Sequence, residues 1–172
     1  MKWEQIRKIH SSASAAFAAA AEGVSSEKWT VPRAEGKWSA AEIVEHLNLA
    51  YATLLRELTG GKGMQIRTKL WQRLLLRITL VPKLLRGEPF PANARAPREM
   101  RPASADPDPA SAIARFREQS SRFEAVAHEA ITRGRSPDLT HAYFGTASLA
   151  TGVLLCARHV QHHEKQLQEC GS

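Results

Sequence analysis

Apolar residues recur at three- and four-residue steps along four long segments of the chain, the spacing that lines one face of an α-helix. The first segment covers residues 2–21, and the last two cover about 109–132 and a stretch from 146–148 to about 169. Alternating apolar and polar runs rich in β-branched residues, which are typical of strands, are missing from the sequence. The pattern therefore predicts an all-α protein.

The second of these helices has a clear start and a clear end in the sequence. Ser39 can accept a hydrogen bond from the first backbone N–H groups, and Glu42, three residues later, completes a capping box. An apolar row then continues to Leu58, and Gly60 and Gly61 end it. We therefore expect a helix that starts just after Ser39.

An additional basic helix is expected between the second and third long helices. Residues 64–81 place apolar side chains on one side and basic ones on another, and Pro82 is expected to stop the helix. Six prolines follow within residues 87–109, so this stretch should be extended and irregular. The predicted architecture is an all-α four-helix bundle of the antiparallel type, with an extra basic helix and a long Pro-rich connection between the second and third core helices.

Length and composition fit one soluble domain. A chain of 172 residues is most simply a single domain, 1–172, that can bury roughly 70% of its unfolded surface. We expect neither a signal peptide nor the stretch of ~20 apolar residues that spans a bilayer. Two cysteines are too few for a disulfide framework, so we expect a reducing, cytoplasmic location.

One segment generates the whole net charge of +7. Residues 62–101 carry ten Lys and Arg against two Glu, a local charge of +8, so the rest of the chain sums to −1. Lys69, Arg73 and Arg77 give the helix 64–81 two interpretations. It can be a binding module for an anionic membrane surface or for nucleic acid, or its apolar side can pack on the bundle while its basic side is solvated. We expect the second arrangement, and hence no contact with nucleic acid or membrane.

Two helices carry histidines whose spacing is typical of a metal site. His159 and His163 are four residues apart on the last helix, which places them on one face with Cβ atoms ~5–6 Å apart. His46 belongs to the apolar row of the second helix. An imidazole buried without polar partners is costly, and one shared divalent ion would satisfy all three rings. Three neutral imidazoles also leave one coordination position open, as catalytic sites do.

Each of these histidines also has an ordinary structural interpretation. A single inward histidine is usually hydrogen-bonded to a backbone carbonyl, and a pair four residues apart also occurs on solvated faces. His162 points towards the flank of its helix and is the poorer ligand candidate, whereas Gln166 can hydrogen-bond a ligand histidine or a bound water. His10, His128 and His141 are interpreted as ordinary, partly exposed histidines.

The motifs that carry this chemistry occur in the order Trp38-Ser39-x-x-Glu42-x-x-x-His46-Leu47, Phe144-Gly145, and His159-x-x-His162-His163-x-x-Gln166-Leu167. This arrangement resembles the DinB-like superfamily, which includes YfiT-type metal-dependent hydrolases, and the resemblance covers nearly the whole chain. It implies a four-helix bundle, commonly a homodimer, that holds a divalent metal, most often zinc or nickel. The ligands that it implies are His46, His159 and His163.

The resemblance also implies a reaction class. Several members of the superfamily look like transferases or isomerases that use a low-molecular-weight thiol such as bacillithiol, mycothiol or glutathione. We therefore expect the transfer of such a thiol to a small electrophilic substrate, with metal-dependent hydrolysis as the alternative. A bundle that has lost catalysis, or that uses metal only for stability, is a third interpretation.

Few residues beyond the three histidines can be given a role from the sequence. Glu42 lies one turn before His46 and can orient its second ring nitrogen, although the capping box uses the same carboxylate. Tyr143 and Phe144 can line a substrate cleft or belong to the core. No carboxylate is clearly placed as a general base, so we leave the catalytic residues unassigned.

Overall fold

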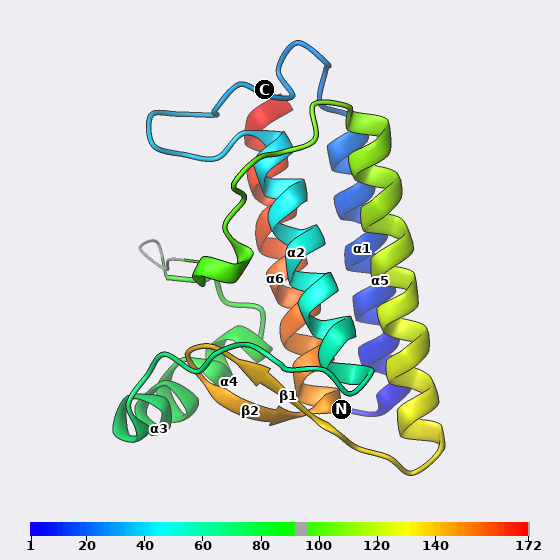
Figure 1. Cartoon of the computed structure of the whole chain (residues 1–172), viewed down its shortest axis with the longest axis vertical. Helices are drawn as coiled ribbons and strands as arrows, with labels where there is room; N and C mark the ends of the chain where they lie inside the picture. The colour runs from blue at the N-terminus through cyan, green and yellow to red at the C-terminus, as the bar shows by residue number, and fades with distance from the viewer. Residues whose placement is uncertain (92–95, 172) are drawn as a thin grey trace.

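Four long α-helices form the body of the molecule in a computed structural model, which describes residues 1–91 and 96–171 (Figure 1). The helices are α1 Trp3–Glu22, α2 Ala40–Leu58, α5 Pro109–Thr132 and α6 Leu149–Gly171. The apolar periodicity predicts all four, and the capping box of Ser39 and Glu42 is present at the start of α2. The predicted all-α four-helix bundle is therefore confirmed.

The helices of the bundle form two parallel pairs rather than an antiparallel series. In Figure 1, α1 and α6 lie side by side and run upwards, and α2 and α5 lie side by side and run downwards. The expectation of antiparallel neighbours therefore holds only between the pairs, for α1 against α5 and α2 against α6. The reason is the long connection after α2, which returns along the bundle before α5 begins.

The basic segment forms two helices instead of the single helix expected over residues 64–81. They are α3 Leu70–Thr79 and the short α4 Val81–Leu85. We expected Pro82 to stop a helix, but this residue lies in the first turn of α4. A proline is tolerated there because the first N–H groups of a helix have no partner within it.

In its described residues, 87–91 and 96–108, the Pro-rich connection is irregular, as expected, apart from one 3-10 turn, η1 Arg98–Met100. Residues 92–95 of this stretch lie outside the described part of the chain. A helix of the length of α2 is about 30 Å long, which about ten extended residues can cover. The stretch is therefore long enough to return along the bundle, and it brings Met100 against α2, where that residue is buried.

A two-stranded hairpin precedes α6, and the sequence pattern does not predict it. Strand β1 Asp138–His141 pairs in antiparallel fashion with β2 Gly145–Ser148. Strands of four residues are too short to show a clear alternation of apolar and polar positions. Gly145 has a positive φ of 74°, and a Cβ atom there would lie 3.2 Å from Cδ of Arg73. The hairpin thus lies directly against α3.

The apolar side of α3 does not pack on the bundle, contrary to our expectation. None of the residues of α3 is buried, and Leu70, Trp71 and Ile78 are 63–75% exposed. The helix is instead attached through its other side, where Arg73 meets the hairpin. In the described part of the chain, no helix combines the length and the apolar character that crossing a bilayer requires.

Aromatic rings fill the centre of the bundle. Phe17 of α1 and Phe116 of α5 have ring centroids 4.6 Å apart, and Tyr51 of α2 lies against Phe116 at 5.6 Å. All three side chains are completely buried. This packing holds the helices in register, so the histidines of α2 and α6 have fixed positions relative to one another.

Candidate metal centre

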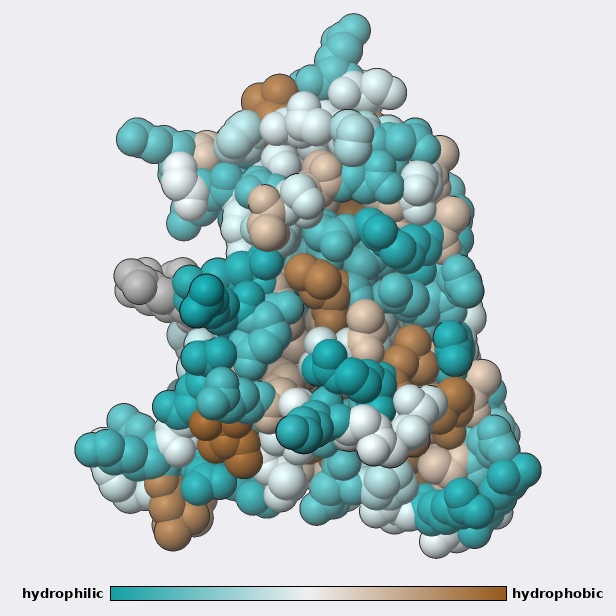
Figure 2. Space-filling view, viewed as in Figure 1, coloured by the Kyte–Doolittle hydropathy of each residue, from teal (hydrophilic) through white to brown (hydrophobic). Residues whose placement is uncertain are grey.

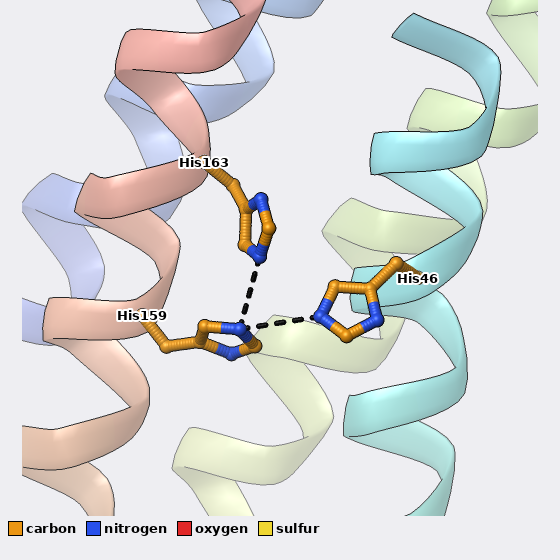
Figure 3. A group of neighbouring side chains, drawn as sticks. All are labelled: His46, His159 and His163. Atoms are coloured by element: carbon orange, nitrogen blue, oxygen red, sulfur yellow. Dashed lines mark hydrogen bonds between the residues drawn. The ribbon is translucent and has the colours of Figure 1, made fainter. Parts of the chain in front are cut away.

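Three imidazole rings converge between α2 and α6, and we call His46, His159 and His163 the ligand cluster. Figure 3 shows His46 projecting from α2 and the other two from successive turns of α6, with their rings directed at one another. Nε2 of His159 lies 3.2 Å from Nε2 of His46 and 3.0 Å from Nε2 of His163. One nitrogen of each ring lies within 4.8 Å of the others. The structure thus brings together the three residues that the sequence indicates as ligands.

Contacts on the outer side of two rings decide which nitrogen faces inward. Nδ1 of His46 donates to the carbonyl oxygen of Met100 at 2.7 Å, and Nδ1 of His163 donates to Oε1 of Gln166 at 2.9 Å. Because a neutral imidazole carries one proton, the inward Nε2 atoms of these rings hold lone pairs. Outer hydrogen bonds of this kind fix the tautomer and orientation of metal-binding histidines.

The inward nitrogens fit a cation better than they fit one another. Two lone pairs face Nε2 of His159, which has at most one proton to donate. Without an ion, one of these nitrogens stays unsatisfied at a cost of roughly 1–3 kcal/mol. Zinc–nitrogen bonds of ~2.0–2.1 Å in a tetrahedral arrangement separate the nitrogens by about 3.3 Å, close to the two spacings measured from Nε2 of His159. The ligand cluster can therefore hold a divalent metal ion.

Burial keeps the three imidazoles in the form that binds metal. It lowers the pKa of His46 to about 4 and the pKa values of His159 and His163 well below their ordinary value. The cause is the poor solvation of a charged imidazolium away from water. Since metals bind neutral imidazole, the lone pairs are available at neutral pH.

Comparisons with known proteins identify the family of the chain and a similar fold. A family model described as the DinB superfamily matches residues 10–167. The chain belongs to the DinB superfamily. Its structure is similar to that of YfiT from Bacillus subtilis, which is described as a probable metal-dependent hydrolase with an unusual four-helix bundle topology. The TM-score is 0.58 and the sequence identity is 15%, and the match covers 98% of this chain and 85% of that chain. A comparison with curated proteins finds no match.

Two of the further residues indicated by the sequence lie beside the ligand cluster of this DinB-superfamily protein. Gln166 contacts His163, as described, and its Nε2 also donates to Nε2 of His162 at 3.1 Å. His162 is not among the converging rings. Gln166 therefore has the orienting position expected of it, and His162 lies outside the ligand set, as its azimuth indicates.

The carboxylate of Glu42 is engaged elsewhere. It accepts hydrogen bonds from the backbone N–H of Ser39 at 2.9 Å and from the Ser39 hydroxyl at 3.2 Å. The orienting contact to His46 comes instead from the carbonyl of Met100. A backbone carbonyl in the Pro-rich connection cannot be recognised from sequence, because every residue has one.

The ligand cluster lies in the wall of a large cavity. Its volume is about 930 Å³, within the usual range for small-molecule sites, and most of its lining residues are apolar. Among the described lining residues there is no Asp or Glu, whereas Arg33, Lys37 and Arg101 are present. Nε of Arg33 pairs with Glu169 at 3.1 Å, but its buried Nη1 has no hydrogen-bond partner in the described part of the chain. The cavity thus combines mostly apolar walls with three cationic side chains.

Aromatic residues from irregular segments enclose the ligand cluster. The ring of Trp38 lies 4.9 Å from that of His46, and the ring of Phe90 lies 5.5 Å from that of His159. Both aromatic residues line the cavity. The sequence does not assign them to the site, because Phe90 reaches it only through the path of the Pro-rich connection.

The hairpin contributes a histidine that the sequence interprets as ordinary. His141 lines the cavity together with Tyr143 and Phe144, and its ring stacks on Phe144 with centroids 4.0 Å apart. Burial lowers the pKa of His141 to about 4. Tyr143 and Phe144 therefore do form part of a cleft, one of the two roles that the sequence allows for them.

A buried histidine outside the cavity has different surroundings. His10 of α1 is 1% exposed, so its interpretation as a partly exposed residue is wrong. Its Nδ1 donates to the carboxylate of Glu124 at 2.9 Å, and its Nε2 accepts from the hydroxyl of Tyr51 at 2.9 Å. Protein groups thus satisfy both ring nitrogens, as is usual for a buried polar side chain.

Proposed function

We propose that this DinB-superfamily protein is a metal-dependent enzyme that transfers a low-molecular-weight thiol to a small electrophilic substrate. The observation that carries the proposal is the position of three inward-facing imidazoles in the wall of a cavity whose described lining has no carboxylate. Three histidine ligands leave a coordination position for a reactant. The missing carboxylate disfavours reactions that need a general base and favours a nucleophile that the metal alone activates.

The ligand cluster would hold the ion, and imidazole nitrogen donors suit zinc or nickel. A bound divalent ion supplies a Lewis acid that keeps a thiol ionised at neutral pH. The Met100 carbonyl and Gln166 keep the Nε2 atoms of His46 and His163 turned inward, where an ion would bind. Trp38 packs against the ring of His46 and Phe90 packs against the ring of His159, which limits the movement of both imidazoles. These residues therefore preorganise the site before any reactant enters.

Arg33 supports a thiol that carries a carboxylate. This side chain lines the cavity together with Lys37 and Arg101, and a carboxylate accepts charge-assisted hydrogen bonds from cationic groups of this kind. Bacillithiol and glutathione have carboxylates and mycothiol has none, so this arginine favours the first two. The apolar remainder of the cavity suits an electrophile with a hydrocarbon portion.

The proposed transfer needs no redox partner. The thiol sulfur forms a bond to an electrophilic carbon of the substrate, and the leaving group departs with the electron pair of the bond that breaks. The thiol proton is released to solvent. Because ionisation of the thiol precedes attack, no lining side chain has to act as a base.

Metal-dependent hydrolysis is the second candidate, and the description of YfiT favours it. Attack by water on an ester or amide ordinarily uses a base within hydrogen-bond reach. The two further lining imidazoles are already engaged, since Nδ1 of His141 accepts from the backbone N–H of Tyr143 and Nε2 of His162 accepts from Gln166. Hydrolysis therefore ranks second.

Elemental analysis of the purified protein tests the metal centre. We expect about one divalent ion per chain in the wild type and loss of that ion in His159→Ala, because one of three ligands is removed. His162→Ala is the matched control, since it removes a neighbouring imidazole that does not converge with the others. Wild-type protein that binds no stoichiometric ion after exposure to zinc or nickel would end the proposal.

A paired activity screen then tests the reaction class. Metal-loaded protein receives 1-chloro-2,4-dinitrobenzene with bacillithiol, glutathione or mycothiol, and thiol consumption is measured beside hydrolysis of a nitrophenyl ester. We expect transfer that requires His159, and a KM that rises in Arg33→Met for the two carboxylate-bearing thiols only. Ester hydrolysis without thiol consumption would replace the proposal with the hydrolase.

A further inference from the structure

The exposed side of α3 is apolar. We call Leu70, Trp71, Leu74, Leu75 and Ile78 the apolar face, and these side chains are 53–75% exposed. They cover an arc of about 140° at 100° per residue. In Figure 2, brown side chains lie beside teal ones at the lower left, where Figure 1 places α3 at the side of the bundle. A group of large apolar side chains in contact with water marks an interaction site.

Contacts on the other side of α3 hold the apolar face outward. The backbone N–H of Arg67 donates to the carbonyl oxygen of Ala142 at 2.9 Å, and the hydroxyl of Thr68 donates to the backbone carbonyl oxygen of Tyr143 at 3.0 Å. The side chain of Arg73 lies against Gly145. The start of α3 is thereby attached to the hairpin, so the exposure of the apolar face follows from the way the helix is anchored.

The segment that bears the apolar face is strongly basic. Residues 62–86 contain seven Lys and Arg and no Asp or Glu. Lys69, Arg73 and Arg77 lie beside Leu70 at one edge of the apolar arc, and Lys69 and Arg77 are exposed. The complementary partner must therefore offer both an apolar surface and negative charge.

An anionic lipid surface meets both requirements. In a two-fold contact between two copies, the same face would meet itself, so the basic residues of both copies would repel one another. Nucleic acid offers phosphates but no apolar environment for five large side chains, because its interfaces are polar and wet. A bilayer boundary takes apolar side chains below its headgroups and pairs cationic ones with lipid phosphates.

We infer that α3 docks the protein on membrane surfaces that contain anionic lipids, with the apolar face inserted at the headgroup boundary and Lys69 and Arg77 paired with lipid phosphates. This docking requires neither metal nor substrate, so it stands apart from the proposed thiol transfer. Leu76 and Leu80, which do not belong to the apolar face, line the cavity. Docking therefore brings the cavity wall within about one helix diameter, ~10 Å, of the lipid.

Vesicle flotation of the full chain tests the inference. We expect binding to phosphatidylcholine vesicles that contain about one third phosphatidylserine, weaker binding to pure phosphatidylcholine, and loss of binding as salt rises. Trp71 fluorescence should shift to the blue on binding, because the indole leaves water. Trp71→Phe should still float but lose most of the shift.

Two double variants separate the contributions of apolar contact and charge. Leu74→Gln/Ile78→Gln should weaken binding at least about tenfold, and Lys69→Gln/Arg77→Gln should weaken it about 30-fold on anionic vesicles. Lys8→Gln/Arg122→Gln is the matched control, because these exposed residues of α1 and α5 lose the same charge away from α3. All variants change exposed side chains, so equal unfolding midpoints should exclude misfolding as the cause.

Three results would overturn the inference. The first is no association with anionic vesicles at low salt, or an equal loss of binding in the control variant. The second is a wild-type dimer that becomes a monomer in Leu74→Gln/Ile78→Gln, which would assign the apolar face to a second copy. The third is binding to an oligonucleotide with no binding to vesicles.

Discussion

Two buried histidine groups in the same bundle have opposite surroundings. The ring of His10 is satisfied by the carboxylate of Glu124 and the hydroxyl of Tyr51. The inward nitrogens of the ligand cluster face only one another. Both groups lie in apolar helix rows, and His10, His46 and His163 are all at most 5% exposed, so burial does not distinguish them. A buried histidine indicates a metal site when the protein leaves its inner lone pair without a donor.

Metal binding should give the largest contrast between the two groups. His46→Ala removes a ligand, so we expect its metal affinity to fall by more than the ~10–100-fold typical of changes outside the ligand set. His10→Ala should keep the wild-type stoichiometry, because its ring is satisfied by protein groups. Titration calorimetry with zinc measures both. Equal losses in the two variants would show that metal binding depends on the whole bundle rather than on the cluster.

Stability should give the reverse contrast. His10→Ala removes one hydrogen-bond partner from the buried hydroxyl of Tyr51 and one from the Glu124 carboxylate, so the free energy of unfolding should fall by roughly 2–3 kcal/mol. His46→Ala should lower the free energy of unfolding of the metal-free protein by less, because it removes one of the inward nitrogens that compete for a single donor. Urea unfolding at neutral pH measures both values. A larger loss for His46→Ala would contradict the distinction.

Acid should destabilise the metal-free protein through the ligand cluster. The unfolded chain protonates His46 near pH 6.5, whereas burial lowers its folded-state pKa to about 4, so the unfolded state binds more protons between these values. The free energy of unfolding should therefore fall as the pH is lowered, by roughly 2 kcal/mol from pH 6.5 to 5 for this residue. Urea unfolding with a chelator measures the slope, and His46→Gln should make it shallower.

Loss of the hydrogen bond between Nδ1 of His163 and Gln166 should have the smallest effect on metal binding. Gln166→Leu keeps the volume but removes the oxygen that accepts from Nδ1, so metal affinity should fall about tenfold with little change in stoichiometry. Gln168→Leu is the matched control, because Gln168 is exposed on the same helix and bonds only Glu164 in the described contacts. An unchanged affinity in Gln166→Leu would mean that His163 needs no orienting partner.

Local spacing accounts for the parts of the fold and the site that could be predicted. The apolar steps place α5 within its observed bounds, and the four-residue interval puts His159 and His163 on one face of α6. The capping box at Ser39 sets the start of α2. Each of these features depends on residues within one or two helical turns, so the chain itself carries the information.

Long-range contacts account for the parts that could not be predicted. The carbonyl of Met100 reaches His46 across more than fifty residues, and His141 enters the cavity because a four-residue strand pair turns it there. The apolar residues of α3 have the periodicity of a buried side, yet the hairpin anchors the helix from its opposite side. Amphipathic spacing shows that a helix has an apolar side but not what covers it.

The sequence by itself determined the four long helices and the three histidines that can meet between two of them, because both follow from side-chain spacing along a regular backbone. Only the tertiary structure decided which histidine nitrogens lack a protein donor, which residues wall the cavity, and which helix keeps its apolar side in water. These depend on the path of the connection between α2 and α5, which returns along the bundle and brings segments distant in sequence into contact.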